Sequence, residues 1–302
     1  MAQISIKQLE AFVQVSDYGS FRRAAERLHT TQPNISARIA GLEAQLDLRL
    51  LDRDAGSVRL TPAGAMLLPK ARLVLGALDD FIGAAGDDNL FDGVLRLGVT
   101  EMIVHSWLGP FLTALKERFP NIDVELTVDV SANLSPVLFK RGLDLTLQSG
   151  PFARQTSGMV DLGSFEMVWV AAPGMFGMDK VLSLRDLARH PILTHARGTL
   201  PFEQLQEHVR AFPDIAVRLV PSTNMSACLQ MTGDGLGVAC LPEAMVRDEI
   251  QSGSLVPLRY LWVPDELSFC ARYDAEVSPS YVGQAAELAG DVSTAFQLRG
   301  GG

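Results

Sequence analysis

Apolar residues recur at helical spacing along most of the first 82 residues of this 302-residue chain. A first helix ends near Gly19, and its apolar positions are Ile6, Leu9, Phe12, Val13 and Val15. Ser20 caps a short helix over 21–28, and Thr31 caps a third helix after a three-residue break at 29–31. The apolar positions of that third helix are Ile35, Ile39, Leu42 and Leu46. Two helices separated by so short a break predict a helix-turn-helix.

A short β-hairpin and a long helix complete this region. Apolar residues precede and follow a turn at 54–57, as in a hairpin. Thr61 and Pro62 then open a helix with an extensive apolar face: Leu67, Leu68, Ala71, Val74, Leu75, Leu78 and Ile82. This face exceeds what a small domain needs, and it therefore predicts a partner helix. Residues 83–92 are rich in Gly and Asp and are expected to form a hinge.

From residue 93 onward, short apolar runs typical of β-strands alternate with helical stretches. Strands are expected at 95–99, 122–128, 143–148, 166–172, 191–195, 216–221, 237–242 and 267–273. Helices are expected near 101–119, 132–141 and 280–298. This alternation predicts an α/β domain with largely parallel sheets, and its length of about 210 residues suits two small lobes.

Composition excludes several classes of protein. The chain is 47% hydrophobic and 20% charged and has three Cys, which excludes a mainly disordered chain and a disulfide scaffold. It has no run of 18 apolar residues, and its first residues lack the apolar segment of a signal peptide. The cytoplasm is therefore the expected location, with no membrane partner.

The net charge of −9 taken whole argues against nucleic-acid binding. The first 82 residues, however, hold 10 Lys or Arg and 9 Asp or Glu, whereas the remainder holds 16 and 26. Seven Arg and no Lys lie between Ser20 and Leu60, and Arg is suited to phosphate and guanine. This asymmetry indicates two different partners, with an ordinary solvated face as the alternative.

The third helix has a polar face that suits the major groove of double-stranded DNA. Its side chains are short hydrogen-bonding groups plus one Arg, and Ala37 permits close approach to base edges. Arg residues on the hairpin fit a wing that lies on the phosphate backbone. A helical hairpin with a polar surface is the alternative interpretation. The candidate DNA-binding residues are Arg22, Thr31, Gln32, Pro33, Asn34, Ser36, Arg38 and Arg53.

This region resembles the DNA-binding domain of LysR-type transcriptional regulators over about 65 residues. The resemblance rests on Gly19-Ser20-Phe21, Ala24-Ala25, Leu28, Thr31-Gln32-Pro33, Ile35-Ser36, Ile39, Leu42-Glu43, Leu48, Leu51, Arg53 and Leu60-Thr61-Pro62-Ala63-Gly64. Many members have Arg directly after the Ser, whereas here Ala37 intervenes before Arg38. The runs VLRLGVTEMIVHSWLGPFLTALKERFPNIDVELTV, LFKRGLDLTL and GDGLGVACLP resemble the family's effector domain more loosely.

The resemblance implies an α+β multidomain fold: a winged helix-turn-helix with a linker helix, then a two-lobed domain like a periplasmic binding protein. The expected divisions are 1–61 (DNA-binding), 62–82 (linker and dimerisation helix), 83–92 (hinge) and 93–302 (effector-binding). The first lobe is expected to span 93–163 and 266–302, and the second 164–265. The implied partners are DNA half-sites, a small-molecule effector, and a second copy in dimers or tetramers. RNA polymerase is a further candidate partner.

Candidate effector-binding residues are those that follow the predicted strands, because ligands of open α/β sheets bind at the carboxyl ends of strands. They are Thr100, Glu101, Ser149, His195, Thr199 and Asn224. Capping or loop roles are the alternative for each residue taken singly. Helix N-termini favour anionic ligands, so a small organic acid is the first candidate for the effector. The Glu101 side chain would repel the carboxylate of such an effector unless that side chain points away. An effector with hydroxyl or amine groups is the rival.

Other chemical signals are weak. Cys228, Cys240 and Cys270 lack CxxC spacing, and the five His form no cluster, so neither redox sensing nor a metal is expected. A GxGxG at 233–237 precedes a strand rather than following one, which argues against a phosphate loop. No catalytic motif is recognised, so no enzyme activity and no cofactor are expected. An enzyme and an isolated binding protein remain the competing classes.

Overall fold

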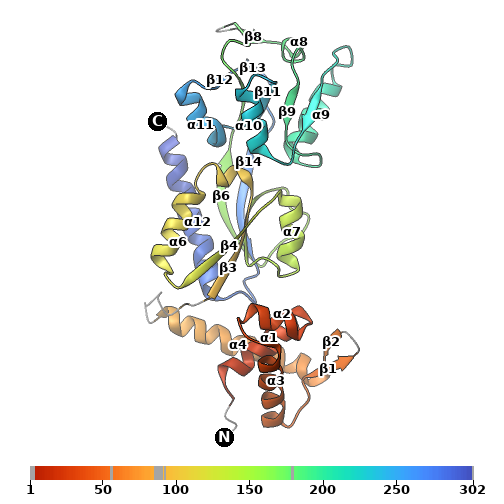
Figure 1. Ribbon diagram of the computed structural model, residues 1–302, viewed down its shortest axis with the longest axis vertical. Helices are drawn as coiled ribbons and strands as arrows, with labels where there is room; N and C mark the ends of the chain where they lie inside the picture. Colours follow the sequence, from red (N-terminus) through yellow and green to blue (C-terminus); the bar gives the residue numbers. More distant parts are fainter. Residues whose placement is uncertain (1–3, 55–56, 85–90, 92, 178–179, 301–302) are drawn as a thin grey trace. The chain divides into compact units, whose positions relative to one another are not determined.

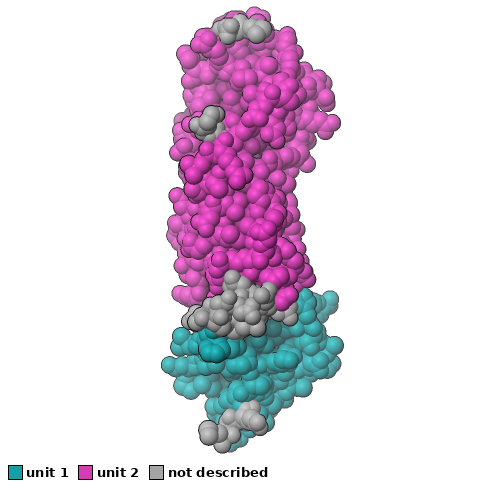
Figure 2. All heavy atoms as spheres, turned by 90° about the vertical axis from the view of Figure 1, so that its left-hand side faces the viewer, with its two compact units in different colours: residues 1–91 teal, residues 92–302 magenta. Residues whose placement is uncertain are grey.

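The computed structural model describes residues 4–54, 57–84, 91, 93–177 and 180–300. The chain divides into two compact units, Met1–Phe91 and Asp92–Gly302 (Figure 2). Each unit has a hydrophobic core of its own. Among the described residues, no helix is long and apolar enough to cross a membrane.

The first unit is mainly helical and carries one hairpin (Figure 1). Its elements are α1 (Ile6–Tyr18), α2 (Phe21–Arg27), α3 (Gln32–Leu46), β1 (Leu51–Asp54), β2 (Ser57–Leu60) and α4 (Pro62–Ala84). Gly19 ends α1 with a φ of 60°, a left-handed conformation that Gly adopts without steric cost. The Ser20 and Thr31 side chains accept hydrogen bonds from backbone N–H groups in the first turns of α2 and α3. The predicted helix-turn-helix is therefore confirmed, caps included.

The hairpin and α4 are fastened to the helical core by side-chain hydrogen bonds. The Glu43 carboxylate on α3 accepts the N–H groups of Leu50 and Leu51, at 2.7 and 3.2 Å. The Thr61 hydroxyl donates to the Arg49 carbonyl at 2.6 Å and accepts the Gly64 N–H at 3.0 Å. A Cβ at Gly64 would lie 2.1 Å from the Leu50 carbonyl oxygen, so only Gly fits there. These contacts explain why Thr and Gly occupy the first and last positions of the Thr61-Pro62-Ala63-Gly64 run.

The second unit begins with a five-stranded sheet in the order β4-β3-β5-β14-β6. Its strands are β3 (Gly93–Val99), β4 (Ile122–Val128), β5 (Leu145–Ser149), β6 (Gly158–Phe165) and β14 (Leu267–Tyr273). The helices α6 (Leu108–Arg118) and α12 (Ser280–Gly300) cover one face, and α7 (Ser131–Phe139) covers the other (Figure 1). This sheet, these helices and α5 (Glu101–Val104) are called lobe I.

A second five-stranded sheet, in the order β10-β9-β11-β7-β12, forms the centre of lobe II. Its strands are β7 (Met167–Ala171), β9 (Ile192–Thr194), β10 (Leu219–Pro221), β11 (Val238–Pro242) and β12 (Val256–Pro257). Lobe II also contains α8 (Leu184–Leu187), α9 (Leu200–Arg210), α10 (Met225–Gly233), α11 (Glu243–Ser252) and a small sheet of β8 (Val181–Leu182) and β13 (Arg259–Tyr260).

Both large sheets are mixed, which corrects the expectation of largely parallel sheets. In lobe I, β14 is antiparallel to β5 and β6, and in lobe II, β7 is antiparallel to β11 and β12. The reason is topological. The chain passes from lobe I to lobe II between β6 and β7 and returns just before β14, and these three strands are antiparallel to their neighbours in the two large sheets.

Two further differences from the sequence-based expectation lie in lobe I. The helix expected near 101–119 is broken into α5 and α6, because Pro110 has no N–H to continue the helical ladder and Trp107 is fully buried at the break. Strand β6 was not predicted at all. It holds Gly158, Asp161 and Gly163, residue types with low strand propensity, and Gly163 has a φ of 80°.

Candidate DNA-contacting surface and interlobe cavity

The candidate DNA-contacting residues cluster at the start of α3. Thr31, Gln32, Pro33 and Asn34 are exposed, and Ser36 and Arg38 are half-buried on its flanks. The opposite face buries Ile35 and Ile39 in the core. The apolar stripe thus fixes the orientation of α3 and leaves its first turn open to a partner.

Some of these side chains already have local partners. Thr31 accepts the Asn34 N–H, and the Asn34 amide donates to the Thr30 hydroxyl at 3.1 Å. Arg22 pairs with Glu26 at 3.0 Å. The side chain of Gln32, in contrast, has no hydrogen-bond partner within the described part of the chain, and it is exposed. Arg53 lies on β1, and its side chain falls outside the described structure.

The helix α4 carries an exposed apolar stripe along the first unit. Met66, Leu73, Val74 and Phe81 keep 64%, 66%, 47% and 73% of their side-chain surface exposed within the single chain. Their spacing places them on one side of the helix, away from Ala71, which packs in the core. Most of the apolar face expected from the sequence packs instead into the core of the first unit, through Leu67, Leu68, Ala71 and Leu75. Of the residues predicted for a partner helix, Val74 is exposed, and the rest of the exposed stripe consists of residues that the sequence analysis did not name.

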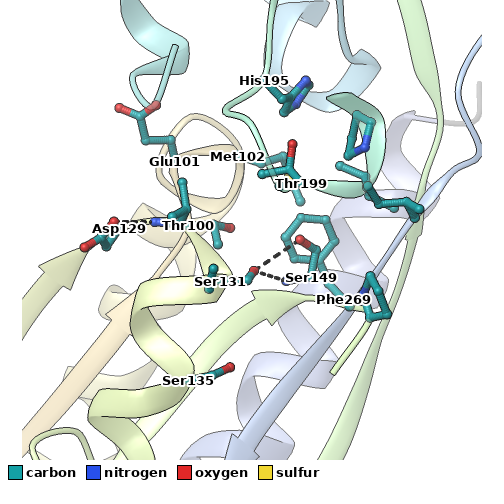
Figure 3. A pocket seen from close by; sticks show the side chains of 18 of the residues that line it. Thr100, Glu101, Met102, Asp129, Ser131, Ser135, Ser149, His195, Thr199 and Phe269 are labelled. Atoms are coloured by element: carbon teal, nitrogen blue, oxygen red, sulfur yellow. Dashed lines mark hydrogen bonds between the residues drawn. The ribbon is translucent and has the colours of Figure 1, made fainter. Parts of the chain in front are cut away.

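A cavity of about 950 Å³ lies between the two sheets of the second unit. All six candidate effector residues line it: Thr100, Glu101, Ser149, His195, Thr199 and Asn224. They come from both lobes because the carboxyl ends of β3, β5, β9 and β10 open toward the same space. Figure 3 shows His195 and Thr199 of lobe II on one side of the cavity and the lobe I residues on the other.

The lobe I wall is built around hydroxyl groups. The Ser131 hydroxyl, at the start of α7, accepts the Ser149 N–H at 3.1 Å and lies 3.3 Å from the Ser149 hydroxyl (Figure 3). The Thr100 hydroxyl is buried and has no hydrogen-bond partner within the described residues. A buried hydroxyl without a partner costs free energy unless a ligand or water supplies one.

The lobe II wall presents a neutral imidazole. Desolvation lowers the pKa of His195 to about 4, so the ring is uncharged near neutral pH. Its Nδ1 is buried and has no partner among the described groups. The Thr199 hydroxyl donates to the Ala196 carbonyl at 2.7 Å, and the Asn224 side chain caps α10 by accepting the Ala227 N–H at 2.7 Å. Thr199 and Asn224 therefore have the local roles that were the alternative interpretation, in addition to lining the cavity.

Glu101 faces lobe II rather than the hydroxyls of lobe I (Figure 3). Its carboxylate accepts the Met225 N–H at the N-terminus of α10. One turn later on the same side of the cleft, His105 Nε2 lies 2.7 Å from the Ser226 hydroxyl. The expected conflict between Glu101 and an anionic effector is therefore reduced, because the helix N-terminus already compensates this charge.

Several lining residues escaped the sequence-based reasoning. They are Ser131, Ser135, Phe139, Phe152, Arg154, Met245 and Phe269. Ser131 is the third residue after β4, as Asn224 is after β10, and the same strand-end rule would have found it. The others come from the body of α7, a loop, α11 and the middle of β14, where no local pattern marks a cavity. Among the described residues, no group of His, Cys, Asp or Glu has the arrangement of a metal site.

The helix-turn-helix with its hairpin and the two-lobed α/β domain with its interlobe cavity define a class of DNA-binding regulators. Residues 6–65 match the bacterial regulatory helix-turn-helix protein, lysR family, and residues 88–285 match the LysR substrate binding domain. The chain belongs to the LysR family. It is a LysR-type DNA-binding transcriptional regulator with an effector-binding domain, as the resemblance in the sequence predicted.

Known relatives agree with this assignment. The HTH-type transcriptional regulator PtxR of Pseudomonas aeruginosa is 30% identical over 262 residues, covering 86% of this chain and 83% of its own. A probable hydrogen peroxide-inducible genes activator of Streptomyces viridosporus is 30% identical over 269 residues, with coverages of 85% and 84%.

Solved structures share the fold at lower identity. A full-length OxyR variant from Pseudomonas aeruginosa has a TM-score of 0.61 and 22% identity, covering 96% of this chain and 97% of that one. ArgP from Mycobacterium tuberculosis has a TM-score of 0.60 and 20% identity, with coverages of 95% and 96%.

Proposed function

We propose that a small-molecule effector binds between the two lobes and thereby changes promoter occupancy and DNA bending. A small organic acid is the first candidate for the effector. The effector must bind two arrangements of the protein unequally, since a ligand with equal affinity for both shifts nothing. The regulator acts in the cytoplasm, where the promoter DNA and RNA polymerase are found, and its contact with RNA polymerase completes the response.

The interlobe cavity is the observation that carries this proposal. Its volume of about 950 Å³ lies in the range of small-molecule sites. Two buried polar atoms that have no partner among the described residues, Thr100 Oγ1 and His195 Nδ1, belong to residues that line it from opposite lobes. A ligand that bonds to both atoms stabilises one separation of the lobes over others.

DNA recognition is proposed to use two copies of the chain. The α3 helix reads base edges through Gln32, and the hairpin lies on phosphates. One such module buries only about 600–1,000 Å², so specific affinity requires two half-sites. The exposed stripe of Met66, Leu73 and Phe81 on α4 supplies an apolar face for a dimer, and two dimers form the tetramer.

Peroxide sensing is a weaker proposal, although relatives are named as peroxide-inducible activators. A sensing thiol must be a reactive thiolate. Burial raises the pKa of Cys228, Cys240 and Cys270, and Cys228 and Cys240 are fully buried. These environments favour the unreactive thiol form.

The test is a library screen coupled to DNA binding. Compounds that raise the melting temperature of the full-length protein are added to footprinting reactions on the DNA beside its own gene. We expect at least one compound to change both the footprint and its DNase-hypersensitive sites, and Thr100→Val to abolish that change while leaving basal DNA binding intact. A normal response of the variant would refute the interlobe site, and turnover of the compound would indicate an enzyme.

A further inference from the structure

Arg272 is a fully buried arginine near the end of β14, behind the lobe I wall of the cavity. Its guanidinium lies 4.0 Å from the ring centroid of Phe152 and 5.7 Å from that of Phe139, and both rings line the cavity. Arginine stays protonated in proteins, so its positive charge is held inside lobe I.

The hydrogen-bond partners of Arg272 are all neutral. Nη1 donates to the Ser135 hydroxyl at 3.3 Å, and Nη2 donates to the Arg154 carbonyl. The donors and acceptors around Gln148 require its amide oxygen to face Arg272, at 2.8 Å from Nη1. Nε has no partner, and no carboxylate pairs with this guanidinium in the described part of the chain. Desolvation accordingly lowers the pKa of Arg272.

A hydrogen-bonded network joins this charge to the cavity surface. The Gln148 amide nitrogen faces the Ser131 carbonyl and the Ser135 hydroxyl, each at 3.3 Å. Ser131 and Ser135 both line the cavity (Figure 3). A second cation reinforces the same end, because the Arg154 guanidinium lies 4.1 Å from the Phe139 ring centroid and also lines the cavity. Arg154 forms no ion pair among the described residues.

The acidic lining residues, in contrast, are compensated. Glu101 accepts the Met225 N–H at the start of α10, and Asp129 accepts the Val130 N–H at 2.7 Å just before α7. Glu203 accepts the Gly198 N–H at 3.2 Å in the first turn of α9. Each carboxylate thus lies near a helix N-terminus, where the helix dipole favours negative charge. Arg154 and Arg272, by comparison, have no carboxylate partner among the described residues.

We propose that the effector is an organic monoanion, and that Arg272 is the positioning residue that makes the cavity select it. The anionic group lies on the Ser131–Ser135 wall near Arg154, where it compensates the buried guanidinium. The apolar part of the effector lies on Phe269, which faces Ser149 across β14 and β5. This inference rests on the proposed interlobe site and specifies its chemistry.

Three probes with one ring and different charges test it: phenylacetate, phenylacetamide and 2-phenylethylamine. Binding to the full-length protein is measured by calorimetry and thermal shift. We expect the anion to bind at least about tenfold more tightly than the amide, and the amine to bind least. Arg272→Met removes this preference, whereas Arg272→Lys keeps it. Arg210→Met, which removes an equal charge from an exposed position of α9, leaves it unchanged.

The ratio of acid to amide affinity separates charge selection from a structural defect, because a damaged fold lowers both affinities together. Circular dichroism confirms the fold of each variant, and Arg154→Gln, at an exposed position, offers a second way to reduce the charge. Equal binding of acid and amide, preference for the amine, or an unchanged ratio in Arg272→Met would overturn the inference. The inference would also be overturned if phenylacetate failed to bind while another compound altered the footprint. That result would leave the proposed function intact.

Discussion

The carboxylate of Glu101, on α5 of lobe I, accepts the backbone N–H of Met225, the first residue of α10 in lobe II. With the pair of His105 and Ser226 at 2.7 Å, it links the lobes beside the cavity. An effector that separates the lobes must break this link, and one that draws them together strengthens it. Glu101 therefore belongs to the lobe contact as much as to the cavity lining.

Glu101→Ala should loosen this contact locally. The amide of Met225 then loses its acceptor, and its hydrogen exchange should become about tenfold faster, which corresponds to a bond of about 1.4 kcal/mol. Glu101→Gln keeps an acceptor oxygen and should show a smaller effect. Exchange of the α4 amides serves as the internal control. Unchanged protection of Met225 in the Ala variant would show that the link contributes nothing.

Gln32→Ala should relax sequence specificity rather than weaken all DNA binding. The Gln32 side-chain amide is exposed at the first position of α3 and has no partner in the part of the chain that the structure describes. Its loss should cost about 1–3 kcal/mol on the preferred half-site and little on unrelated DNA. Gln45→Ala, at an exposed position near the other end of α3, is the matched control. Competition binding on specific and random duplexes measures the difference. Equal weakening of binding to both duplexes would contradict a role of Gln32 in base recognition.

Leu73→Glu should shift the protein from dimer to monomer. Leu73 is 66% exposed at the centre of the α4 stripe, and a carboxylate there would be buried unpaired in a dimer. Ala65→Glu adds the same charge to the flank of the same helix and should leave the dimer intact. Sedimentation velocity distinguishes the two species. A dimeric Leu73→Glu protein would place the dimer contact elsewhere.

His195 should make the stability of the second unit depend on pH. Its pKa is about 4 in the folded chain against 6.5 for the free side chain, so below pH 6.5 the unfolded chain binds a proton that the folded chain does not. Stability falls as the pH drops from 6.5 to 4, by up to about 3 kcal/mol. His195→Gln should flatten this decline in chemical denaturation curves. Burial also lowers the pKa of His208, which both proteins retain, so the difference between them isolates His195. Parallel pH profiles would contradict the prediction.

The sequence was most informative where physical rules are local. Caps at Ser20 and Thr31, the apolar stripe of α3 and the strand-end positions Thr100 and Ser149 follow from patterns a few residues long. Mixed sheets were not predicted, because strand direction depends on where the chain passes between lobes. Arg272 was hidden for a related reason. It lies within an apolar strand run, and only the packing of α7 and the loop after β5 shows that its charge lies behind a cavity.

Arg72 on α4 forms an ion pair with Asp17 on α1, at 2.5 Å. With the Thr61 hydrogen bonds, this ion pair attaches α4 to the helix-turn-helix and the hairpin. In the proposed dimer held through α4, a small change in the angle between the two α4 helices would produce a larger change in the distance between the two α3 helices. The angle between the two α4 helices would thus set the spacing of the DNA half-sites that the dimer can bind.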